Sequence, residues 1–112
     1  MLPKPQRLNL KKDFKWVASG RKLETQYLKL FVKTGSNQIP KVGIAISAKS
    51  FNKANERNRA RRLVSSAFES VYLNLPENIN ILVLPKRGVL NVKSDLVLLD
   101  LEELLKHEKI IN

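Results

Sequence analysis

Four arginines lie within six residues of a stretch whose apolar spacing predicts an amphipathic helix: Arg57, Arg59, Arg61 and Arg62. Cations in the first turns of a helix oppose its macrodipole, typically by about 0.3–1 kcal/mol each, so this placement is poor for stability alone. An anionic partner would compensate, and guanidinium groups donate paired hydrogen bonds to phosphate oxygens. We therefore expect this stretch to bind a polyanion. The alternative is a solvated helix face that has no ligand.

The apolar residues of the same stretch indicate which side of the helix packs against the protein. Asn52 or Asn55 is placed to cap the start of the helix. At helical spacing, Asn58, Arg62 and Ser65 are expected to point away from the core. The side expected to face the core comprises Ala60, Leu63, Val64, Ala67, Phe68 and Val71.

The net charge of the 112-residue chain is +11, and the charge is unevenly distributed. Residues 1–33 carry nine basic and two acidic side chains, and residues 34–62 carry seven and one. Residues 63–112 carry five basic and seven acidic side chains, so this part is expected to be scaffold. The polyanion site must draw on the first 62 residues, and nucleic acid is the first candidate for the ligand.

Several classes of protein are disfavoured by composition. The chain has no cysteine, which excludes disulfides and thiolate metal sites. No apolar run approaches the roughly 18–20 residues of a membrane span, and the first ten residues lack the apolar core of a signal peptide. The basic stretches alternate with strand patterns, which disfavours a helix lying on an anionic membrane. We expect a cytoplasmic protein that does not bind membranes.

A second pattern mixes aromatic rings with cations. Residues 23–33 alternate as one strand, which places Tyr27, Lys29, Phe31 and Lys33 on one side. Rings that stack on bases, beside cations that neutralise phosphates, suit single-stranded nucleic acid. The alternative is a sheet face covered by a helix, from which the lysine stems reach solvent. Small residues from a second strand are expected to floor a groove beside Phe31; they are Gly43, Ala45 and Ser47.

The order of elements predicts one α+β domain spanning residues 1–112, with a mixed sheet. The expected elements are a basic flexible arm at residues 1–8, a helix capped by Asn9 and ending near Ser19, strands at 23–33 and 41–47, the arginine helix, a buried strand at 79–84, and a last helix capped by Ser94. The apolar side of the last helix is expected to comprise Leu96, Val97, Leu99, Leu101, Leu104 and Leu105.

The search for a catalytic site within the chain finds no candidate. His107 is the only histidine and lies far along the chain from the basic half. Only Asp13, Glu24 and Glu56 among the acidic residues lie in the basic half, and they do not suggest a two-metal cluster. No glycine-rich phosphate loop is present. We expect no metal site and no catalytic residue in the protein.

The segment from Lys53 to Leu63, Lys-Ala-Asn-Glu-Arg-Asn-Arg-Ala-Arg-Arg-Leu, resembles the Arg-Asn-Arg signature of the protein subunit of bacterial ribonuclease P. The resemblance covers about residues 7–105. Its other matching parts, in order, are Arg7-Leu8, Asp13-Phe14, Gly20-Arg21, the strand to Phe31, residues 42–47 (Val-Gly-Ile-Ala-Ile-Ser) and the apolar strand before Pro85. Three places depart from the family pattern: Ala18 stands at a usually aromatic position, Ser65 stands at a usually basic one, and residues 49–53 read Lys-Ser-Phe-Asn-Lys where Lys-Lys-x-Gly-Asn is usual.

This resemblance implies a fold and a function. The fold is a two-layer α/β sandwich with a mixed four-stranded sheet and a left-handed strand-helix-strand crossover. The protein is a monomer in a ribonucleoprotein whose catalytic RNA holds the Mg²⁺ and removes the 5′ leader from precursor tRNA. The protein itself binds no cofactor. The competing interpretations are a structural RNA-binding protein of ribosomal type, and a stand-alone nuclease, which the residue inventory disfavours.

The resemblance, together with the patterns above, assigns two groups of candidate site residues. The group expected to bind the catalytic RNA is Arg7, Lys11, Lys12, Lys49, Lys53, Arg57, Asn58, Arg59, Arg61 and Arg62. The group expected to line the cleft for the single-stranded leader is Phe14, Trp16, Tyr27, Lys29, Phe31, Lys33, Ala45 and Ser47.

Overall fold

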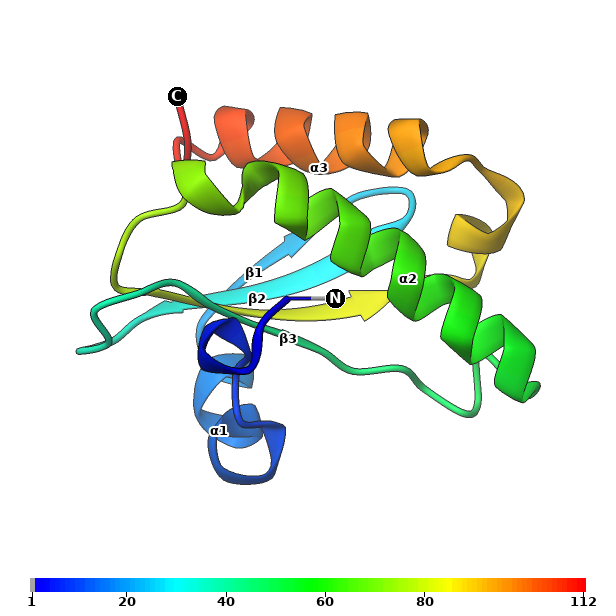
Figure 1. The fold of residues 1–112 in the computed structure, drawn as a ribbon, viewed down its shortest axis with the longest axis horizontal. Helices are drawn as coiled ribbons and strands as arrows, with labels where there is room; N and C mark the ends of the chain where they lie inside the picture. Colours follow the sequence, from blue (N-terminus) through cyan, green and yellow to red (C-terminus); the bar gives the residue numbers. More distant parts are fainter. Residues whose placement is uncertain (1) are drawn as a thin grey trace.

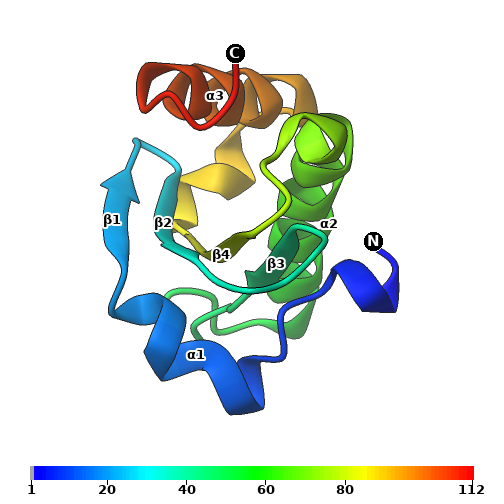
Figure 2. The same ribbon diagram turned by 90° about the vertical axis from the view of Figure 1, so that its left-hand side faces the viewer.

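A computed structural model describes residues 2–112 and confirms the α+β class with a mixed four-stranded sheet. The elements are a 3-10 turn η1 (Lys4–Gln6), α1 (Leu10–Ala18), β1 (Arg21–Glu24), β2 (Leu28–Thr34), β3 (Lys41–Ile44), α2 (Ala54–Val71), η2 (Tyr72–Asn74), β4 (Ile79–Pro85), η3 (Arg87–Asn91) and α3 (Ser94–His107). The strand order is β1-β2-β4-β3; only β3 and β4 are parallel, and α2 connects them. Helices α2 and α3 cover one face of the sheet, and α1 lies on the other (Figures 1 and 2).

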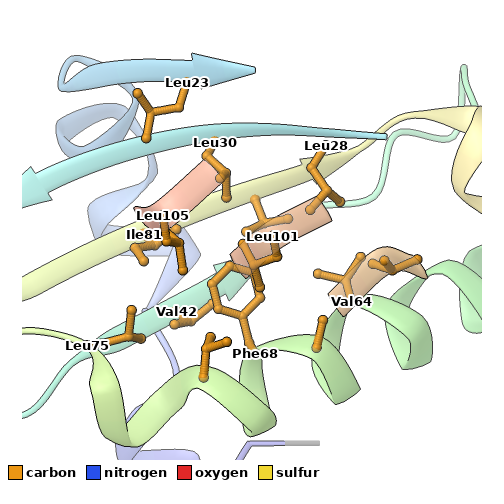
Figure 3. Close-up of a cluster of buried hydrophobic side chains, with 14 of the residues drawn as sticks. Leu23, Leu28, Leu30, Val42, Val64, Phe68, Leu75, Ile81, Leu101 and Leu105 are labelled. Atoms are coloured by element: carbon orange, nitrogen blue, oxygen red, sulfur yellow. The ribbon is translucent and has the colours of Figure 1, made fainter. Parts of the chain in front are cut away.

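The main core lies between the sheet and the pair of helices α2 and α3. Alternation along β2 sends Leu28 and Leu30 to this side, and both side chains are fully buried. The central strand β4 contributes Ile81 and Val83, as expected for a strand with neighbours on both edges. Figure 3 shows Phe68 of α2 among these side chains, and the helices further contribute Val64, Val71, Val97, Leu101 and Leu105.

A smaller core lies under α1 on the opposite face. Val17 of α1, Leu82 of β4 and Leu8 are buried there, and Phe31 packs against them half-buried. The predicted cap of α1 is confirmed, because Asn9 Oδ1 accepts hydrogen bonds from the backbone N–H groups of residues 11 and 12 at 3.1 and 3.3 Å. This cluster fixes α1 across the middle of the sheet.

The single strand expected at residues 23–33 is wrong, because the chain turns back at Thr25 to form a β1–β2 hairpin. Thr25 Oγ1 accepts hydrogen bonds from the N–H groups of Tyr27 and Leu28 at 3.2 and 3.0 Å, and donates one to Asp100 Oδ2 of α3 at 2.5 Å. A threonine hydroxyl that satisfies the backbone of a turn competes with the strand ladder. The alternation of side chains between the two faces of the sheet therefore holds from Leu28 onward but does not extend across the turn.

A flexible arm was expected at residues 1–8, and the structure shows the described residues 2–8 packed against the rest of the protein. Leu2 and Leu8 are buried, and the Leu8 N–H donates to the carbonyl oxygen of Val42 at 3.1 Å, which ties the segment to β3. Prolines and cations are typical of an extended arm, but the burial of the two leucine side chains stabilises the packing of this segment against the protein. The segment covers the side of α2 that carries Ser65, so Ser65 is 3% exposed instead of facing solvent as expected.

The predicted starts of α2 and α3 need correction as well. The N-cap positions are Lys53 and Lys93, neither of which makes a side-chain capping bond; Ser94 is the first residue of α3. Within α3 the core-facing side is narrower than expected, with Leu96 and Leu99 exposed. The connection before α2 contributes Phe51, a fully buried core residue that no local periodicity indicates. Its ring anchors the chain just before the arginine helix.

Candidate RNA interface

The first half of α2 presents the arginines to solvent. Asn58, Arg59 and Arg62 are exposed, and Arg61 is half-buried. Among residues 2–112, neither Arg59 nor Arg62 has a carboxylate partner. Unpaired guanidinium groups near the start of an uncapped helix keep their donors free for an anionic ligand. We call Asn58, Arg59, Arg61 and Arg62 the arginine surface.

Arg57 has a different environment from its neighbours. Its Nη1 donates to the carbonyl oxygen of Phe51 at 2.8 Å, and the side chain is half-buried. The contact closes the connection between β3 and α2 over the buried Phe51 ring. Arg57 therefore supports the local fold, in addition to any contact that it makes with RNA.

Glu56 joins the start of α2 to the turn after β4. Its carboxylate accepts a hydrogen bond from Arg87 at 2.9 Å, and Arg87 Nη1 also donates to the carbonyl oxygen of Ser50 at 3.0 Å. The hydrogen bond from Arg87 holds the pKa of Glu56 below its usual range. Arg87, in the basic stretch that follows β4, is thus bonded to protein groups and not left free.

The remaining cations of the expected RNA-binding group lie outside the arginine surface, on three different segments. Arg7 and Arg61 line one cavity of about 140 Å³, with Leu2 and Ser65 also in its wall, so the N-terminal segment extends the arginine surface. The others are exposed on α1 and on the connection before α2: Lys11, Lys12, Lys49 and Lys53.

On the face of the sheet that carries α1, the side chains form three zones along the strands. The middle zone lies under the helix, where Phe31 of β2 is opposite Leu82 of β4. Gly43 is covered there, since a Cβ at this residue would lie 2.7 Å from Leu10 and 3.1 Å from Leu8. The expected floor of small residues is therefore open only beyond Gly43, at Ala45 and Ser47.

The first open zone is a cavity of about 320 Å³, which we call the Lys29 cleft. Lys29 Nζ lies 5.7 Å from the centre of the Phe31 ring, within reach of a cation–π contact. Lys86 at its rim is paired with Glu24 at 2.5 Å, and this contact lowers the pKa of Glu24. The cleft is lined by Glu24, Lys29, Ala45, Ser47, Ser50, Leu84, Pro85, Lys86 and Arg87.

The second open zone lies at the other end of the strands, and we call it the Trp16 pocket. It is lined by Asp13, Trp16, Ser36, Asn37, Lys41 and Asn80. Lys33 lies at this end too, with its Nζ 5.2 Å from the Trp16 ring centre and 2.8 Å from Ser19 Oγ. Trp16 and Lys33 are thus separated from the Lys29 cleft, contrary to the single cleft that we expected.

The other two aromatic candidates also differ in placement. Phe14 is 38% exposed on α1, and helical spacing places it on the flank opposite Asp13 and Trp16. Tyr27 was expected on the cleft face but packs with the main core on the far side of the sheet, because the hairpin removes it from the strand. Of the eight expected cleft residues, the structure brings Lys29, Phe31, Ala45 and Ser47 together.

The side chains that could do hydrolytic chemistry are scattered. Within residues 2–112 no three His, Cys, Asp or Glu side chains are placed to hold a metal ion together. His107 is exposed at the end of α3, and its Nδ1 lies 2.9 Å from Glu108 Oε2. None of the helices in this part of the chain has the length and apolar character needed to cross a bilayer.

Comparison with known proteins identifies the family. A family model described as Ribonuclease P matches residues 2–109. The ribonuclease P protein component of Chlamydia muridarum is 41% identical over 91 residues, which cover 80% of this chain and 75% of that protein. The corresponding protein of Blochmanniella pennsylvanica is 29% identical over 107 residues, or 95% and 93% of the two chains.

Solved structures agree with the sequence comparisons. The ribonuclease P protein of Thermotoga maritima superposes with a TM-score of 0.79 at 27% identity, covering 90% of this chain and 96% of that chain. A mutant of the Staphylococcus aureus protein has a TM-score of 0.84 at 19% identity, over 96% and 92% of the two chains, which supports the fold alone. The chain therefore belongs to the bacterial ribonuclease P protein family, the RNA-binding protein subunits of the ribonucleoprotein enzyme that processes tRNA.

Proposed function

We propose that the arginine surface binds the catalytic RNA of ribonuclease P, and that the Lys29 cleft holds the single-stranded 5′ leader of precursor tRNA. The observation that carries this proposal is the connection between the two sites. Ser50 and Arg87 line the Lys29 cleft, and Arg87 is bonded to Glu56 in the first turn of α2. A leader in the cleft would therefore lie beside the RNA bound at α2.

The chemistry of the two sites fits the two ligands. The exposed guanidinium groups of Arg59 and Arg62 can each donate paired hydrogen bonds, which suits the closely spaced phosphates of a folded RNA. The Lys29 cleft has a volume of about 320 Å³ and combines an ammonium group, apolar lining and, beside Lys29, the Phe31 ring. Such a groove binds single strands with little dependence on sequence.

Membership of the family supports the remaining features of the proposal. The RNA holds the catalytic Mg²⁺ and carries out the hydrolysis, and the protein acts as a cytoplasmic monomer within the complex. The protein's contribution is to place the leader and to neutralise phosphates near it. Neutralisation of this kind favours binding of a substrate that has a leader over binding of the mature product.

The test is to reconstitute the holoenzyme with a bacterial ribonuclease P RNA and to measure its affinity for precursor and for mature tRNA. Lys29→Ala is expected to lower the affinity for the precursor severalfold and to leave the affinity for mature tRNA unchanged. Lys93→Ala, at an exposed lysine before α3, is the matched control and should change neither affinity. Equal losses for both tRNAs with Lys29→Ala would contradict leader binding in this cleft.

A further inference from the structure

The Trp16 pocket is left unused by the proposed function. It is an open hollow of about 450 Å³, within the range of about 300–1,000 Å³ typical of small-ligand sites. Apart from Trp16, every residue that lines it is polar or charged. Asp13 and Trp16 are three residues apart on α1, so they share one flank of the helix, away from Phe14.

Asn80 gives the pocket a hydrogen-bond acceptor whose orientation is fixed by the protein. The side chain is 3% exposed, and its Nδ2 donates to Asn37 Oδ1 at 2.8 Å and to the carbonyl oxygen of Lys33 at 3.3 Å. These acceptors fix the orientation of the amide. Within residues 2–112 the opposite atom, Asn80 Oδ1, accepts no hydrogen bond. Among the described residues no buried side-chain oxygen or nitrogen lacks a partner, so Asn80 Oδ1 is open to solvent and a ligand in the pocket can reach it as a donor.

Asp13 and Lys41 add one charge of each sign to the wall. Both side chains are half-buried, and neither is paired with any residue in the described part of the chain. The pocket therefore offers a carboxylate and an amide oxygen as acceptors, with one ammonium group as a donor. This set suits a ligand that has several N–H groups on one edge and a phosphate or carbonyl oxygen elsewhere.

Trp16 supplies an aromatic surface beside these groups. Its side chain is 40% exposed although it lies against the β2–β3 loop. A Cβ on Gly35 would lie 2.9 Å from Trp16 Cη2 and 2.8 Å from Asn80 Nδ2, so the ring edge and the amide meet over this glycine. Gly35 permits that close approach. An exposed indole next to unpaired acceptors is the arrangement that recognises an unstacked base.

We propose that the Trp16 pocket binds one unstacked guanosine of single-stranded RNA, at a site separate from the Lys29 cleft. The base stacks on the Trp16 ring. Guanine presents N1–H and N2–H₂ on its Watson–Crick edge, and the Asp13 carboxylate accepts from both, while Asn80 Oδ1 accepts the second N2 hydrogen. Lys41 neutralises the phosphate. Uracil has one N–H on that edge and leaves an acceptor unpaired.

The chain provides its own probe, because Trp16 is its only tryptophan. The free protein is titrated with a short oligouridylate that contains one guanosine, with the all-uridine oligomer, with an inosine-containing oligomer, and with guanosine monophosphate. We expect saturable quenching of Trp16 fluorescence, with the guanosine oligomer binding about tenfold more tightly than the all-uridine one. Inosine lacks the N2 amino group and should lose much of this preference. The free nucleotide should bind more weakly than the oligomer; equal affinity would show a mononucleotide site and contradict RNA as the ligand.

Asp13→Asn should abolish the preference for guanosine while it retains the fluorescent ring. Asp95→Asn, the same change in the first turn of α3, is the matched control and should leave the titration unchanged. Phe31→Leu, which concerns the Lys29 cleft, should also leave it unchanged, so failure of leader binding and failure of this proposal are distinguishable. Absence of saturable quenching, or equal quenching by the guanosine, inosine and all-uridine oligomers, would overturn the proposal even if Asp13→Asn failed to fold.

Discussion

The Arg57 guanidinium donates a 2.8 Å hydrogen bond to the carbonyl oxygen of Phe51, whose ring is fully buried. This contact distinguishes Arg57 from Arg62, which lies five residues further along α2, is exposed and has no carboxylate partner among residues 2–112. The two arginines belong to one motif in the sequence, but the structure gives them different roles.

We predict that Arg57→Ala lowers the free energy of unfolding by about 1 kcal/mol, since a charge-assisted hydrogen bond to a buried segment is lost. Arg62→Ala should leave the free energy of unfolding unchanged and weaken binding of the catalytic RNA by roughly 1–3 kcal/mol. Urea denaturation and RNA titration measure the two quantities. A destabilised Arg62→Ala, or an unaffected Arg57→Ala in urea, would reverse the assignment.

The Glu56–Arg87 contact predicts a dependence of stability on pH. Because the pKa of Glu56 is lowered in the folded protein, its contribution is fully present above the ordinary glutamate pKa of about 4.3. The contribution is lost as the pH falls through the lowered pKa. The difference in urea midpoint between the protein and Glu56→Gln should therefore be constant above about pH 5 and shrink below pH 4. Glu103→Gln, at an exposed residue of α3, is the control.

The charge of the first 62 residues predicts how RNA affinity depends on salt. These residues carry sixteen basic and three acidic side chains, and the exposed cations of α2 and α1 should displace counterions from RNA. About six phosphate contacts would give a slope of roughly −4 to −5 in a plot of log affinity against log salt concentration. The measurement is a titration of the catalytic RNA at several salt concentrations. A slope near zero would exclude an interface dominated by phosphates.

The sequence was sufficient for features set by local periodicity. The Asn9 cap, the apolar run of β4 and the apolar side of α2 from Ala60 to Val71 all follow from spacing alone, and the structure confirms them. Features set by contacts between distant residues were not accessible in this way. The turn at Thr25 depends partly on Asp100 of α3, and no local pattern encodes that contact.

The candidate site shows the same division. The arginines were identified correctly by type, but the bond from Arg57 to Phe51 depends on the path of a loop. The single aromatic cleft became two sites because α1 packs across the middle of the sheet, over Phe31 and Leu82. Ser65 was expected to face solvent because helical phase alone cannot show that the N-terminal segment covers that side of α2.

The ring of Phe31 lies at the boundary between the smaller core under α1 and the Lys29 cleft. The side chain is half-buried, and Lys29 Nζ lies 5.7 Å from the ring centre. Phe31→Leu keeps most of the buried apolar area but removes the ring edge and its cation–π contact. Stacking of a base on a ring is worth roughly 1–3 kcal/mol, so a leader nucleotide placed there would lose up to that amount.

The expected result is weaker binding of precursor tRNA with a long leader, and little change for mature tRNA or for the catalytic RNA. The measured quantity is the ratio of affinities of the reconstituted holoenzyme for the two tRNAs, with and without the substitution. Trp16→Leu is the informative comparison, because it removes the aromatic ring on the other flank of α1. If Trp16→Leu changes the ratio and Phe31→Leu does not, the leader binds in the Trp16 pocket. If neither changes it, Phe31 serves only to pack α1 on the sheet, and leader recognition by the protein rests on the cations alone.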